Sequence, residues 1–106
     1  MLEMIMAVAD RTRLQILLLL GKKGQMCVGD IAGCFKISRP AISHHLKVLK
    51  TYELVGHEKT GQEIIYSVSC GNIVRTLRAL ADELERCAGL ETTSGQAAAI
   101  GKREGA

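Results

Sequence analysis

Side chains that could bind nucleic acid recur at helical spacing in the middle of the chain. They share one face of a predicted helix that carries three cations and no acid. The face presents Arg39, Ser43, Lys47 and Lys50, with Pro40 and His44 alongside. Arginine suits a bidentate contact with guanine, and lysines neutralise phosphates. This face predicts binding to double-stranded DNA, the alternative being a solvated basic helix on an ordinary helical domain.

Four cysteines offer a second kind of chemistry. The first nine residues lack the basic segment and long apolar core of a signal peptide, so we expect a cytoplasmic protein whose cysteines are thiols. Thiolates bind thiophilic metals and react with oxidants. Cys27 lies near a predicted helix start, where a thiolate is favoured, although a cysteine there could also take the place of a Ser or Thr cap.

The basic face must be positioned by residues 28–52, which predict two helices joined by a three-residue turn. Apolar side chains recur at helical spacing opposite the cations, at Ile42, Leu46 and Leu49. Ser38 is well placed as the N-cap of the second helix, and Pro40 lies in its first turn, where a missing N–H costs little. This pattern is typical of a helix-turn-helix, whose second helix enters the major groove.

Two further helices are predicted before this stretch. Residues 2–9 form a short helix with one apolar stripe, and Asp10 can cap the helix that follows. Residues 12–20 are apolar almost all round, which predicts a buried central helix. The stretch Gly21-Lys22-Lys23-Gly24 is expected to end it, with a glycine just past residue 20 and lysines that complement the helix dipole.

A β-hairpin and a long helix are predicted after residue 52. The strands are residues 54–58 and 63–68, around a glycine-containing loop at 59–62. A hairpin in this place is a wing, and its tip, with Lys59 and Gln62, suits a contact with the DNA backbone or minor groove, a solvated turn being the alternative. Residues 72–87 carry a heptad-like apolar seam, which predicts packing against a second copy.

Composition narrows the range of functions. In a chain of 106 residues we expect one domain over residues 1–88 and a flexible tail over residues 89–106. Three aromatic residues are too few for stacking on single-stranded nucleic acid, and no apolar run is long enough to span a membrane. Neither a Gly-rich phosphate loop nor a catalytic set of side chains supports an enzyme. The expected fold is mainly α with a β-hairpin wing, a dimeric winged helix-turn-helix.

Four motifs carry a family resemblance: ADRTRLQILLLL, MCVGDIA, SRPAISHHLKVLKTYELV and the hairpin ending IIYSVS. They resemble the ArsR/SmtB family of winged-helix repressors over roughly residues 2–87. The resemblance implies a homodimer formed by the first and last helices and release from operator DNA when an inducer binds. It implies DNA contacts by Ser38, Arg39, Pro40, Ser43, His44 and Lys47, with Lys59 and Gln62 in the wing. Relatives often have Gln where this chain has Arg39, which would change the base that is read.

The resemblance also implies sensing of thiophilic metals, of metalloids such as arsenite, or of redox species, with no cofactor required. Arsenic- and cadmium-type members carry Cys-Val-Cys where this chain has Cys27-Val28-Gly29, so a local arsenite site lacks one thiolate. Zinc-type members use the last helix, where this chain has Cys70, Asn72, Glu83, Arg86 and Cys87. Cys70 of one subunit could approach Cys87 of the other in an antiparallel pair, or both could be small apolar residues. A winged-helix module without sensing is the alternative.

Overall fold

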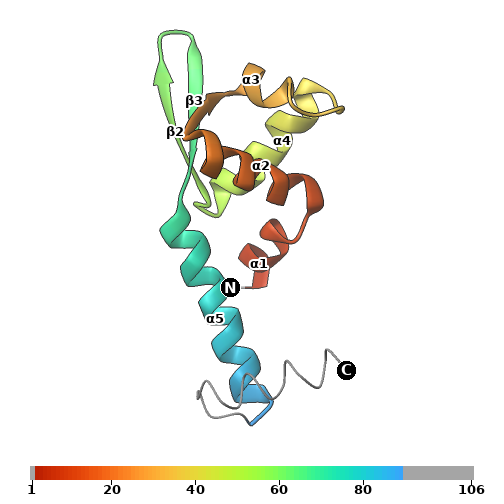
Figure 1. Cartoon of the computed structure of the whole chain (residues 1–106), viewed down its shortest axis with the longest axis vertical. Coiled ribbons are helices and arrows are strands. Elements are labelled where there is room, and N and C mark those ends of the chain that lie inside the picture. Colours follow the sequence, from red (N-terminus) through yellow and green to blue (C-terminus); the bar gives the residue numbers. More distant parts are fainter. Residues whose placement is uncertain (1, 90–106) are drawn as a thin grey trace.

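The computed structural model describes residues 2–89. The elements in this range are α1 (Leu2–Val8), α2 (Arg11–Lys23), β1 (Gln25–Cys27), α3 (Val28–Ala32), α4 (Arg39–Thr51), β2 (Val55–Thr60), β3 (Glu63–Val68) and α5 (Cys70–Cys87). Figure 1 shows the β2–β3 hairpin at one end of the molecule and the free end of α5 at the other. The fold is mainly helical with a wing, as predicted, while the expected tail lies outside the described residues apart from Gly89.

Helix α2 begins one residue before the predicted start and ends three residues after the predicted end. The Asp10 carboxylate accepts a hydrogen bond from the Arg13 backbone N–H at 3.0 Å, so the predicted cap is confirmed. The predicted end at residue 20 was wrong, because the helix includes Gly21 and continues to Lys23, although the stop lies within the predicted stretch of residues 21–24. Gly24 provides the stop: its φ is +92°, a left-handed value that favours glycine, and its N–H donates to the Leu20 carbonyl at 2.8 Å.

The inner face of α2 is buried and its outer face is not. Ile16 and Leu20 are fully buried, whereas Leu14 and Leu18 are 42% and 67% exposed. The prediction of a helix buried on all sides was therefore wrong for the single chain. Its outer leucines form part of an apolar surface that includes α5.

Helices α3 and α4 pack against each other as a helix-turn-helix with a longer turn than expected. Because α3 ends at Ala32, six residues rather than three separate it from α4. Ser38 caps α4 through a hydrogen bond that its hydroxyl accepts from the Ala41 N–H at 3.2 Å. Pro40 lies in the first turn. Both features of the α4 start agree with the sequence prediction.

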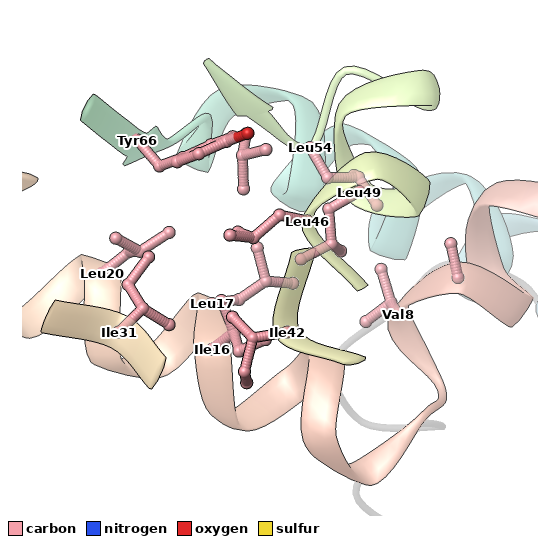
Figure 2. Packing of buried hydrophobic residues seen from close by; sticks show 12 residues of the cluster. Val8, Ile16, Leu17, Leu20, Ile31, Ile42, Leu46, Leu49, Leu54 and Tyr66 are labelled. Atoms are coloured by element: carbon pink, nitrogen blue, oxygen red, sulfur yellow. The ribbon is translucent and has the colours of Figure 1, made fainter. Parts of the chain in front are cut away.

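The hydrophobic core is built on the inner face of α4. Ile42, Leu46 and Leu49 have no exposed surface. Figure 2 shows them facing the buried side chains of α2, α3 and the start of the wing, which are Ile16, Leu17, Leu20, Ile31 and Leu54. Burial of aliphatic side chains from so many elements fixes α4 against the rest of the domain.

The wing belongs to a three-stranded antiparallel sheet of order β1-β3-β2. β1 was not predicted: it pairs with the second half of β3, from Gln25 opposite Ser67 to Cys27 opposite Ile65. In the hairpin Thr60 pairs with Glu63, so the loop has two residues instead of the expected four. Gly61 is the first of them and has a φ of +63°, which a tight hairpin turn requires.

Helix α5 starts at Cys70, two residues before the predicted start. Several of its apolar side chains face outward, with Val74 46%, Leu77 47% and Leu84 59% exposed. Between residues 2 and 89, none of the helices combines the length and the apolar character needed to cross a membrane. An apolar stripe on a helix with so many charged residues favours association with another protein surface.

Candidate nucleic-acid interface

The outward face of α4 presents the side chains predicted to bind DNA. Ile42, Leu46 and Leu49 turn inward, and the opposite face carries no carboxylate. The exposed residues of α4 and its cap include Ser38, Arg39, Pro40, Ser43, His44, Lys47 and Lys50. All seven predicted residues of α4 and its cap are therefore exposed to solvent, and the three cations among them have no carboxylate beside them on this helix.

The start of α4 lies beside the start of α3 and the tip of the wing. A Cβ atom built on Gly29 would lie 3.8 Å from Arg39 Nη1 and 4.0 Å from Cys27 Sγ. These residues line a cleft of about 190 Å³ together with Gln62 and Glu63 of the hairpin. Arg39 and Gln62 thus border the same cleft, whereas Lys59 is exposed on β2 and does not line it.

His45 differs from its neighbour His44, which is exposed. The His45 Nδ1 atom lies 3.3 Å from Arg13 Nη1 and 4.0 Å from Asp10 Oδ2. Burial lowers the pKa of His45; Arg13 and His44 also lower it, and Asp10 opposes them. His45 belongs to the boundary between core and surface.

Arg13 is the residue that the sequence analysis missed. Its Nε donates to the Ala7 carbonyl at 2.7 Å, so the side chain joins α1 to α4 across α2. The sequence did contain a signal for Arg13: it is a charged residue among the apolar residues of α2, and such a residue needs a polar partner. The sequence does not show that the partner is thirty-two residues away.

The cysteines are free thiols at four separate places. Cys27 is the N-cap residue of α3 and is half-buried, but its side chain makes no capping hydrogen bond. Cys34 is exposed and donates to the Asp30 carbonyl at 3.4 Å. Cys70 and Cys87 are the first and last residues of α5, about 26 Å apart at 1.5 Å per residue. Within residues 2–89 of one chain, no group of three or more His, Cys, Asp or Glu side chains is placed to hold a metal ion.

Other polar side chains of α5 are engaged inside the chain. Asn72 Nδ2 donates to the Glu53 carbonyl at 2.6 Å, and Arg75 donates to Asn72 Oδ1. Glu53 has a φ of +58°, the left-handed region, directly after α4. Glu83 pairs with Arg86 on the next turn. Asn72 therefore connects α5 to the end of α4.

Comparisons with known proteins agree with this geometry. Residues 10–56 match the model of the bacterial regulatory protein, arsR family. The transcriptional repressor SmtB homolog of Synechocystis is 33% identical over 85 residues, which are 80% of this chain and 64% of that protein. The transcriptional repressor SdpR of Bacillus subtilis is 51% identical over 63 residues, which are 59% of this chain and 69% of that protein.

The fold agrees with solved structures. A crystal structure described as a possible transcriptional regulator for arsenical resistance superposes with a TM-score of 0.71 and 34% identity, over 80% of this chain and 86% of that one. The family model covers the helix-turn-helix and its support, and the superposition extends over most of the domain. The arsenical resistance operon repressor of Escherichia coli is 35% identical over 86 residues, which are 81% of this chain and 73% of that protein. The chain therefore belongs to the arsR family, whose members are DNA-binding transcriptional regulators and not enzymes.

Proposed function

We propose that this chain is a homodimeric repressor that binds operator DNA in a sequence-specific manner. The observation that carries the proposal is the outward face of α4, which has three cations, no acid and a buried aliphatic opposite side. Such a helix can enter the major groove while the core holds it at a fixed angle. A DNA-binding repressor acts where the DNA is, so we place it in the cytoplasm.

The proposed DNA contacts fall into two groups. Arg39, at the first turn of α4, reads a guanine, and Ser43 and His44 reach base edges or phosphates. The remaining contacts position the helix and wing. Ser38, Lys47 and Lys50 contact phosphates, Lys59 and Gln62 contact the DNA backbone or minor groove, and Pro40, which has no donor, makes only a packing contact. Phosphate contacts carry no sequence information directly, so Arg39 accounts for most of the direct readout.

We propose that two copies associate through their uncovered apolar surfaces. These surfaces lie on the first and last helices and extend onto α2, and their most exposed members are Leu2, Met6, Leu14, Leu18, Val74, Leu77 and Leu84. A groove of about 530 Å³ between α2 and α5 has an almost entirely apolar lining. An apolar surface of this extent is unusual for a monomer and typical of an interface.

Leu77→Glu is expected to convert the dimer to a monomer, because it places a carboxylate on the apolar seam. Sedimentation equilibrium at micromolar concentration measures the change. Arg78→Glu introduces the same side chain one residue later, at a position that is already exposed and charged, and should leave the dimer intact. A Leu77→Glu protein that still sediments as a dimer would place the interface elsewhere.

We further propose that a thiophilic metal or metalloid, or an oxidant, releases the repressor from DNA through its cysteines. Cys27 supports this proposal because it borders the same cleft as Arg39. Cys70 and Cys87 lie at the two ends of the proposed interface helix, where an antiparallel partner would bring them together. The alternative is a winged-helix module without sensing. In its favour, Asn72 is occupied by hydrogen bonds within the chain.

Fluorescence anisotropy tests both proposals. The reduced protein is titrated onto a duplex from its own upstream region at fixed salt, and arsenite, cadmium, zinc or a persulfide is then added singly. A sensor releases the duplex with one of these agents, and Cys27→Ser, Cys70→Ser or Cys87→Ser abolishes that release. Cys34→Ser is the matched control and should respond like the natural protein. Tight binding that none of the agents reverses would favour the module without sensing.

A further inference from the structure

Arg13 connects α1 to α4 through a rigid group. Its Nε donates to the Ala7 carbonyl at 2.7 Å, and its Nη1 lies 3.3 Å from His45 Nδ1. The guanidinium group is planar, so two contacts on the same plane fix the separation between their partners. The Arg13 side chain thereby fixes the distance between the last turn of α1 and the middle of α4.

This connection lies at the edge of the apolar contacts between the two helices. Ala7 and Val8 are buried in the same core as the inner face of α4. Beside Arg13, a cleft of about 320 Å³ between α1 and α4 is lined by Met6 and Val48 among others, so apolar packing is incomplete there. At this level the Arg13 side chain provides the polar contact that joins α1 to α4.

His45 can exchange partners at Nδ1. Neutral His45 accepts from Arg13 at this atom, whereas a protonated Nδ1 is a donor and must turn to an acceptor. The Asp10 carboxylate, 4.0 Å away, is that acceptor, and it already accepts from the Arg13 backbone N–H. The charged or titratable groups facing His45 are Asp10, Arg13 and the neighbouring His44.

We propose that Arg13 is a positioning residue for DNA binding, and that protonation of His45 transfers Nδ1 from Arg13 to Asp10 and weakens binding. The inference rests on the proposed function, in which α1 belongs to the dimer interface and α4 binds DNA. His44, next to His45, is on the DNA-binding face, so loss of the Arg13 contact beside it disturbs a direct contact with DNA while the buried face of α4 stays in place.

The sign of the pH effect follows from the environment of His45. Because burial lowers its pKa below the ordinary 6.5, the folded chain favours the neutral ring. The unfolded chain takes up the proton first as pH falls below about 6.5, so the connection is complete above that pH and is lost as pH falls through the lowered pKa. By contrast, protonation of an exposed histidine near phosphates adds a positive charge beside the DNA, so it raises DNA affinity as pH falls.

The test is anisotropy on the same duplex at pH 7.5 and at successively lower pH in constant salt. We expect the natural protein to lose affinity by about fivefold or more once the pH is below the lowered pKa of His45, the lower end of ordinary coupling between sites. His45→Asn keeps an acceptor for Arg13 but does not titrate, so its affinity should not fall. His57→Asn, a change to an exposed wing histidine outside the proposed contact set, is the control and should keep the loss.

Arg13→Lys gives an independent measurement. Lysine keeps the charge, but its single nitrogen cannot occupy the positions of both Nε and Nη1, so affinity at pH 7.5 should fall to the acid value of the natural protein. Unchanged affinity in Arg13→Lys, or a His45→Asn protein that weakens like the natural one, would overturn the positioning role. Absence of DNA binding at every pH would instead contradict the proposed function.

Discussion

Leu46→Ala is expected to lower the free energy of unfolding by about 2–5 kcal/mol, the range for truncating a large aliphatic side chain in a packed core. Leu46 has no exposed surface and lies between Ile42 and Leu49 on the inner face of α4. In Figure 2 it points toward the α2 side chains, so its loss leaves a cavity where two helices meet. Chemical denaturation followed by circular dichroism measures the change at a fixed protein concentration, because association adds to stability.

Lys47→Ala is the matched control for this measurement. The residue is next in sequence, lies in the same helix and is exposed, so its loss should change the free energy of unfolding by less than about 0.5 kcal/mol. Its DNA affinity should fall at low salt, since a phosphate contact is lost. A Leu46→Ala protein as stable as Lys47→Ala would contradict the packing of α4 described above.

Arg39→Ala is expected to weaken binding to the cognate duplex by about 1–3 kcal/mol and to reduce the preference for that duplex over random DNA. Arg39 is exposed at the first turn of α4, where Ser38 fixes the helix start and Gly29 lies beside the guanidinium group. Anisotropy on both duplexes, each over a range of salt concentrations, distinguishes a contact of Arg39 with a base from a contact with a phosphate.

Lys50→Ala provides the contrast for Arg39. It lies in the last turn of α4 and should weaken cognate and random duplexes equally, while the slope of log affinity against log salt falls by about 1. If Arg39→Ala behaves in this same way, Arg39 contacts a phosphate and the sequence is read by another side chain.

The sequence predicted the elements whose signals are local. Ser38 and Asp10 were identified as caps because a short polar side chain precedes an apolar-periodic run, and both make the expected hydrogen bond. The inner face of α4 followed from its periodicity. The resemblance to the arsR family followed from the motifs, and the comparisons confirm it.

The errors have identifiable physical causes. Helix α2 was expected to end before Gly21, but a glycine on an exposed helix surface is tolerated, and the left-handed residue is Gly24. β1 has three residues and exists only because β3 is there to pair with it, forty residues later. The connection from Arg13 to Ala7 and His45 depends on the packing of three helices, which has no signature in local spacing.

The two faces of α4 carry separate properties of the molecule. Ile42, Leu46 and Leu49 hold the domain together on one side, while the side chains available to DNA on the other side support no part of the core. Operator preference can consequently be retargeted by substitutions at Arg39, Ser43 or His44 while the folded state keeps its stability, whereas Ser38 must remain as the cap of α4. His45 is the exception: it contacts Arg13 at the border between the two faces, so a substitution there would affect both the packing of the domain and DNA binding.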